Sequence, residues 1–170
     1  MKVRRIVTGH TPGGQSVVAS DDQVATMPVG GNGTGVALLW GRDDHGDFPD
    51  DGGPQPMATS FPRVGGCACA IWELAPEDDE FDDFIVQALE PWADANEPGM
   101  HRTATLDYDI VLEGVIGLEL DNGVEVMLGP GDIVVQNGTR HRWRNRGDSI
   151  ARMVAVTVGA QNRLTGGRPV

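Results

Sequence analysis

Short apolar runs between glycine- and proline-rich turns are the feature that most limits the folds open to this chain. The runs are rich in Val and Ile and recur about every ten residues, a spacing typical of all-β proteins. The chain has 24 glycines and 11 prolines, which punctuate these runs. We expect strands at 2–8, 15–20, 35–40, 67–74, 101–105, 108–114, 115–120, 124–129, 132–136, 141–145 and 151–158.

Residues that favour turns lie between most of these runs. Asp121-Asn122-Gly123, Gly129-Pro130-Gly131-Asp132 and Asn137-Gly138 combine residues that tolerate positive φ, so each predicts a turn or hairpin. The acidic stretch 41–56 contains Gly and Pro throughout and shows no period, which predicts a surface loop.

One segment, residues 76–92, has helical rather than strand periodicity. Acidic residues crowd its first turns, where they favour a helix, and Pro91 ends it. We expect one short helix here, with its apolar stripe packed on the barrel mouth or on a partner. The stripe consists of Phe81, Phe84, Ile85, Ala88 and Leu89.

Charge and length exclude several classes of protein. The chain has 170 residues with 13 basic and 25 acidic side chains, a net charge of −12, which disfavours binding to nucleic acid or anionic lipid. It contains no run of 18 apolar residues, and its first ten residues lack a signal-peptide pattern. We expect one domain over residues 1–170, cytoplasmic, with no nucleic-acid or membrane partner.

Several conspicuous side chains have ordinary structural interpretations. Cys67 and Cys69 share a strand face, too close in sequence for an unstrained disulfide, and are interpreted as small buried residues without chemistry. His10 and His45 lie in a turn and an acidic loop, where exposed polar residues are expected. Tyr108 should face away from Asp107. Three arginines alternate with His141 and Trp143 along a predicted strand and should form an exposed basic face; they are Arg140, Arg142 and Arg144.

Two spacings in the second half of the chain carry the chemistry. In "GMHRTATLDYDIVLEG", His101 is followed by Thr103, Asp107 and the turn glycine Gly114. Downstream, "GPGDIVVQNGTRHRWRN" supplies Gly131, Gly138, His141 and Asn145 in order.

These spacings resemble the two motifs of the cupin superfamily, and the resemblance covers about residues 99–158. It is closest to small single-domain cupins described as cupin-domain oxidoreductases, some from natural-product pathways. The resemblance implies a cupin double-stranded β-helix, or jelly-roll barrel. It also implies metal ligands at His101, Asp107 and His141. Thr103 stands where the family has a second histidine, Asp replaces the usual Glu at 107, and Gln136 stands where proline is usual.

Strand alternation supports a shared site beside that resemblance. His101 and Thr103 would share the inner face of a barrel, and Asp107 and His141 could reach it from neighbouring strands. Two histidines and one carboxylate form the facial set of non-haem Fe(II) centres, so we expect a divalent metal, with Fe(II) favoured and Mn, Ni or Zn as alternatives. One Asp leaves a charge of about +1 at the metal, which favours an anionic or bidentate oxygen ligand. Thr103, Gln136 and Trp143 are the expected substrate contacts, and no dedicated catalytic acid or base is visible.

The function expected from these features is a metal-dependent small-molecule oxidoreductase, of the dioxygenase kind, for an oxygenated aromatic or polyketide-like metabolite. A non-redox decarboxylase, dehydratase or isomerase would fit the same Lewis-acid site. A cupin that has lost its metal and only binds a small ligand is a third interpretation, and an inactive dimeric barrel is a fourth. A homodimer is expected, with the two N-terminal strands as candidates for pairing across it.

Overall fold

Almost every regular element in the described part of the chain is a β-strand. The computed structural model describes residues 2–29, 33–77, 92–94, 96–161 and 163. The strands are β1 Lys2–His10, β2 Ser16–Ala25, β3 Met27–Pro28, β4 Gly35–Arg42, β5 Cys67–Leu74, β6 Thr105–Glu113, β7 Ile116–Leu120, β8 Glu125–Leu128, β9 Ile133–Gln136, β10 His141–Arg144 and β11 Ala151–Gly159, with a 3-10 turn, η1, at Asp121–Gly123.

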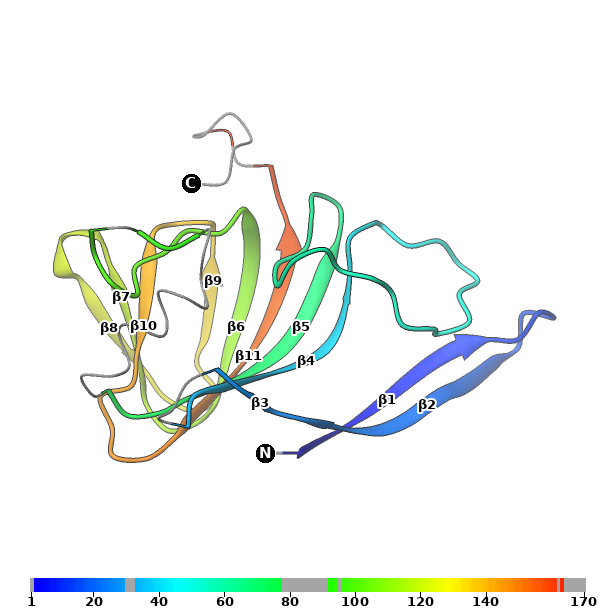
Figure 1. Cartoon of the computed structure of the whole chain (residues 1–170), viewed down its shortest axis with the longest axis horizontal. Helices are drawn as coiled ribbons and strands as arrows, with labels where there is room; N and C mark the ends of the chain where they lie inside the picture. The colour runs from blue at the N-terminus through cyan, green and yellow to red at the C-terminus, as the bar shows by residue number, and fades with distance from the viewer. Residues whose placement is uncertain (1, 30–32, 78–91, 95, 162, 164–170) are drawn as a thin grey trace.

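The strands form two facing sheets and a separate hairpin. One sheet has six strands in the order β3-β4-β5-β11-β6-β9, and the other has three in the order β10-β7-β8. Within each of these two sheets, all neighbouring strands are antiparallel. In Figure 1 the three-stranded sheet stands opposite the curved six-stranded sheet, while the hairpin of β1 and β2 extends away from both. This arrangement is the all-β, two-sheet barrel expected from the sequence.

The core lies between the two facing sheets. Residues of β11 alternate strictly between buried and half-buried positions over most of the strand, as a period of two requires when one face is covered. The buried apolar cluster draws on β5, β6, β7, β8 and β11 and consists of Leu74, Val111, Ile116, Leu118, Leu128, Ala151 and Met153. Trp143 of β10 packs on its edge, so the core continues directly into the site described below.

The predicted turns are present and have the backbone that their residues allow. Asn122 and Gly123 both have positive φ, 64° and 69°, in the connection between β7 and β8. Gly138 has φ 61°, and a Cβ added there would lie 3.0 Å from the carbonyl oxygen of Thr103. This close approach brings the β9–β10 turn against the segment that carries His101 and Thr103.

Three expectations differ from the structure or fall outside it. The strand predicted at 101–105 is wrong: His101 makes only isolated bridges, to Ala93 and His141, and the strand begins at Thr105. Cys67 is exposed and Cys69 is half-buried, so neither is the buried residue expected. The predicted helix over 76–92 falls on residues 78–91, which are outside the described part. No helix among the described residues is long and apolar enough to cross a membrane.

Candidate functional site

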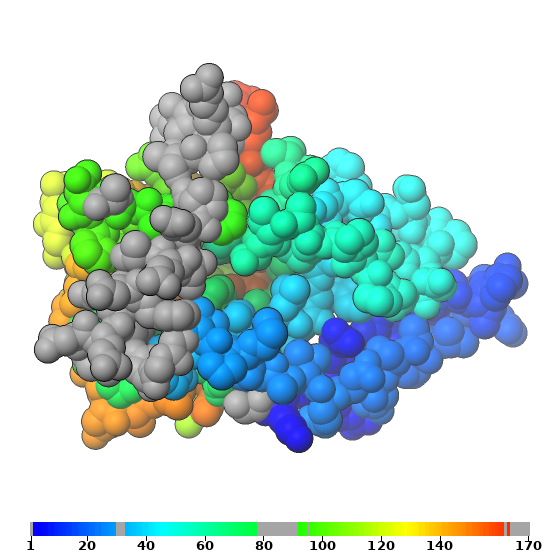
Figure 2. All heavy atoms as spheres, viewed as in Figure 1, coloured from blue at the N-terminus to red at the C-terminus, as the bar shows by residue number. Residues whose placement is uncertain are grey.

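A pocket opens between the two sheets at one end of the barrel. Strands β5, β6, β10 and β11 supply most of its wall, and the segment before β6 supplies its base. Figure 2 shows a hollow near the centre of the visible face, where deeper side chains can be seen. The pocket is lined by Val29, Thr34, Phe61, Trp72, Leu74, Gly99, His101, Thr103, Asp107, Asp109, His141, Trp143, Met153, Ala155 and Thr157.

His101 and His141 form a close pair at the base of this pocket. Two backbone hydrogen bonds join them. The His101 N–H donates to the His141 carbonyl (2.9 Å), and the His141 N–H donates to the His101 carbonyl (3.0 Å). The ring centroids lie 4.2 Å apart. Two residues that are 40 positions apart in the sequence are therefore in direct contact.

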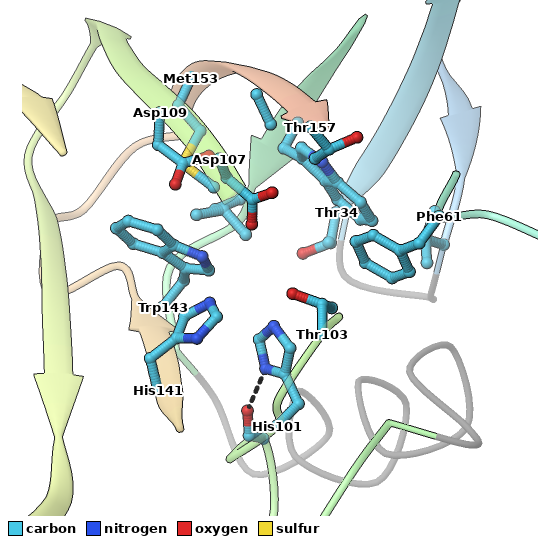
Figure 3. Close-up of a pocket in the computed structure, with 15 residues that line it drawn as sticks. Thr34, Phe61, His101, Thr103, Asp107, Asp109, His141, Trp143, Met153 and Thr157 are labelled. Carbon is cyan, nitrogen blue, oxygen red and sulfur yellow. Dashed lines mark hydrogen bonds between the residues drawn. The ribbon is translucent and has the colours of Figure 1, made fainter. Parts of the chain in front are cut away.

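The hydrogen bonds of the two rings settle which nitrogen faces the pocket. His101 Nδ1 donates to the carbonyl oxygen of Gly99 (3.0 Å), the dashed bond in Figure 3, and His141 Nδ1 donates to that of Thr139 (2.9 Å). Since a carbonyl can only accept, each Nδ1 carries the hydrogen and each Nε2 keeps its lone pair. Burial lowers the pKa of His101, and burial together with the neighbouring His101 lowers the pKa of His141 to about 3. Both imidazoles are neutral near pH 7, as metal ligation requires.

Asp107 and Asp109 line the pocket from β6. They are two residues apart, so their side chains share the inner face of the strand. Each is only 5% exposed. Burial raises the pKa of Asp107 to about 6, and burial together with the charge of Asp107 raises the pKa of Asp109 to about 7. Oδ1 of Asp107 is buried and has no hydrogen-bond partner among the described residues.

The residues predicted to contact substrate have different positions. Thr103 lines the pocket beside His101, and its hydroxyl shares a 2.7 Å hydrogen bond with that of Thr105. Trp143 also lines the pocket, edge-on to His141 at 5.5 Å. Gln136 is fully buried but does not line the pocket: its Oε1 accepts hydrogen bonds from the N–H and the hydroxyl of Thr139. It holds the turn that leads into His141.

The interpretation of the arginines as an exposed basic face is wrong. The side chains of Arg140, Arg142 and Arg144 are only 17–19% exposed, and each is held in ion pairs. Glu119 of β7 receives both Arg142 and Arg144 at 2.8 Å. For Arg142 the cause is the pairing of β10 with β7, which sets it opposite Glu119.

Sequence reasoning missed several lining residues, above all Asp109. Strand alternation from Asp107 was the signal that could have found it. Phe61 and Thr34 carry no such signal, because they come from irregular segments whose path depends on tertiary packing.

The donor atoms fit a divalent metal at the two histidines. Two neutral imidazoles with free Nε2 atoms and an unpartnered carboxylate oxygen in the same pocket are groups that such ions bind. Across the described part of the chain, however, no three His, Cys, Asp or Glu side chains converge on one metal position. Figure 3 shows the reason: Asp107 faces the histidines from the opposite end of the pocket. The structure therefore pairs two of the three predicted ligands and leaves Asp107 apart.

Comparison with known proteins finds a family match over part of the chain. Residues 86–157 match the cupin domain family. Over 63 residues the chain is 51% identical to phomopsin biosynthesis cluster protein C′ of Diaporthe leptostromiformis, covering 36% of this chain and 33% of that protein. Over 89 residues it is 37% identical to cupin-domain-containing oxidoreductase fogC of Aspergillus ruber, covering 51% and 44%. The chain thus spans less than half the length of these relatives.

Solved structures resemble the chain more distantly. The polyketide cyclase RemF of Streptomyces resistomycificus aligns with a TM-score of 0.46 at 19% identity, covering 79% of this chain and 72% of that one. An ethanolamine utilization protein of Salmonella typhimurium aligns with a TM-score of 0.45 at 12% identity, covering 95% and 99%. The sequence match identifies residues 86–157 as a segment similar to a cupin domain, and this segment lies in the two-sheet barrel.

Proposed function

We propose that this chain is a metal-dependent cupin enzyme that acts on a small molecule, of the oxidoreductase or dioxygenase kind. The observation that carries the proposal is the pair of buried, neutral histidines whose Nε2 atoms are free at the base of an otherwise largely apolar pocket. Relatives named as oxidoreductases support the reaction class.

His101 and His141 would hold the metal, and we propose Asp107 as the carboxylate that completes the set. A bound Fe(II), or Mn, Ni or Zn, supplies a Lewis acid and open positions for substrate oxygen atoms, and Fe(II) also supplies redox chemistry. The carbonyls of Gly99 and Thr139 orient the two rings, which is the role of outer hydrogen bonds at metal sites.

The remaining lining residues bind and orient the substrate. Phe61, Trp72 and Trp143 offer flat apolar surfaces, which suits an aromatic or polyketide-like body. The Thr103 hydroxyl, in the position of a usual family ligand, can hydrogen-bond a substrate oxygen next to the histidines. The apolar wall excludes water from the polar groups, which strengthens their interactions with a bound substrate.

A second candidate function is a metal-free cupin that binds a small ligand. Two observations favour it: Thr103 replaces a ligand and is hydrogen-bonded to Thr105, and the described residues bring only two predicted ligands together. A non-redox lyase or isomerase would use the same metal site as the leading proposal.

The metal content of the full chain, purified without chelator, tests the proposal. We expect near-stoichiometric Fe, Mn, Ni or Zn in the wild type. His101→Ala and His141→Ala should weaken the metal affinity by more than the roughly 10–100-fold loss known for outer-shell changes. His45→Ala, which removes an exposed histidine outside the pocket, is the matched control and should retain the metal.

Wild-type protein that takes up none of these ions when they are supplied would contradict the enzyme and favour the ligand-binding cupin. If metal binds, oxygen uptake with candidate diols or β-diketones separates an oxygenase from a non-redox lyase.

A further inference from the structure

The pocket carries acidic charge that no basic side chain in its wall offsets. Asp107 and Asp109 line it, and the described residues of its lining include neither Lys nor Arg. Arg142 and Arg144 of β10 and Arg140 just before it are held by Glu119, Glu77 and Asp94, respectively. Both histidines that face the pocket are held as hydrogen-bond donors at Nδ1 and present only a lone pair.

The carboxylate of Asp107 is separate evidence that the pocket lacks a hydrogen-bond donor or cation that a ligand would supply. Its carboxylate points into the pocket (Figure 3), its side chain is more than nine-tenths buried, and its Oδ1 has no hydrogen-bond partner in the described part of the chain. A buried carboxylate oxygen without a donor is costly, so such oxygens are normally hydrogen-bonded or paired with a cation.

Asp109 changes the charge expected from the sequence. When both aspartates are ionised, the pocket is negative without a metal and close to neutral with a divalent metal at the histidines. In neither state does the pocket have the positive charge that an anionic substrate needs. The expectation of an anionic ligand is therefore not supported by the residues that line the site.

We propose that this pocket selects a substrate that carries an amine, with its nitrogen seated on Asp109 and, in the metal-free pocket, also on Asp107. An ammonium group donates up to three hydrogen bonds and brings the charge that the two carboxylates lack, whereas a hydroxyl donates one and brings none. Trp143, Trp72 and Phe61 complete the fit, because aromatic faces attract cations and hold a flat apolar body. Asp109 is then a specificity-determining residue. The proposal rests on the proposed function in that it seats the substrate in the same pocket.

Three probes with one phenyl ring and a two-carbon linker test it: phenethylamine, 2-phenylethanol and 3-phenylpropanoate. Binding to the full chain, kept metal-free with chelator, is followed by calorimetry and by fluorescence of the pocket tryptophans. Hydrogen bonds between charged groups are stronger than those between neutral groups. Phenethylamine should therefore bind at least about tenfold more tightly than the alcohol, and the carboxylate should bind weakest.

Asp109→Asn should reduce the affinity for the amine about tenfold and leave that for the alcohol unchanged. Asp107→Asn provides a second variant with the same expectation, and far-UV circular dichroism checks the fold of both. Asp148→Asn, the same change at an exposed carboxylate outside the pocket, is the matched control.

A carboxylate probe that binds as tightly as the amine, an amine that does not bind, or an equal effect of Asp109→Asn and Asp148→Asn would each overturn the proposal. The proposed metal-dependent function is tested separately. It fails if the protein takes up no metal, whereas the amine preference is measured without metal.

Discussion

The buried carboxyl of Asp109 makes the stability of the folded state depend on pH. Burial and the charge of Asp107 raise the pKa of Asp109 from 3.8 to about 7, so between these values the folded state binds a proton that the unfolded chain has released. Stability contributed by this proton is complete below pH 3.8 and is lost as the pH rises toward 7. At about 1.4 kcal/mol per pKa unit, the loss amounts to roughly 4 kcal/mol.

We therefore expect Asp109→Asn to be more stable than the wild type at pH 8 and to lose less free energy of unfolding between pH 5 and pH 8. Urea unfolding at each pH measures this, with Asp148→Asn as the control. Equal pH profiles for Asp109→Asn and the wild type would show that Asp109 does not titrate with folding. Asp107, with its pKa raised to about 6, should add a smaller loss in the same direction over a lower pH range.

At the scale of one element, the turn between β6 and β7 depends on Gly114. Its φ is +78°, and a Cβ there would lie 2.7 Å from Cβ and 2.8 Å from Cα of Ala151 on β11. Gly123, in the turn between β7 and β8, has a similar φ of +69°, but a Cβ there would meet nothing within 4 Å. The two glycines thus share the left-handed backbone and differ only in the space available.

Alanine at Gly123 should cost about 1 kcal/mol, the usual strain of a non-glycine residue in this region. Alanine at Gly114 should cost several kcal/mol more, because the backbone of β11 must move. Thermal or urea unfolding of the two variants gives the comparison. Equal losses would mean that the close approach to Ala151 does not limit this turn.

At the scale of the whole molecule, we propose that the chain forms a homodimer through the outer face of the six-stranded sheet. Tyr108 lies opposite Val135 and Ile110 lies opposite Ile133, which forms an apolar and uncharged patch at the β6–β9 edge. Ile133 is 62% and Val135 is 53% exposed. On a chain with a net charge of −12, such a patch can meet its own copy with little repulsion. The N-terminal strands pair with each other within one chain.

Light scattering after size exclusion should give twice the 18.1 kDa mass of one chain for the wild type. Ile133→Lys combined with Val135→Lys should halve this value. The control pair is Val124→Lys with Val126→Lys, at positions 54% and 47% exposed at the start of β8 in the other sheet, and it should leave the dimer intact. A monomeric wild type, or equal behaviour of both pairs, would contradict this interface.

The sequence alone predicts most strands and turns, because these depend on local chemistry. The β11 run alternates as a half-covered strand must, and Asn122-Gly123 takes the positive φ that its residues tolerate. The sequence is a poorer guide where a segment has no neighbouring strand to pair with along its whole length. His101 has strand-like neighbours, yet it forms only isolated bridges, to Ala93 and His141, and regular pairing begins at Thr105.

By itself, the sequence determined the all-β barrel and the presence of His101, Thr103, Asp107 and His141 in cupin-like spacing, since periodicity and motif spacing are properties of the chain. Only the tertiary structure decided which groups meet. It set the two imidazoles 4.2 Å apart, placed Asp107 across the pocket, and added Asp109 to its wall. It also paired the β10 arginines with Glu119. The physical reason is that distance and burial, which set charge, pKa and ligand geometry, arise between strands that are far apart in sequence.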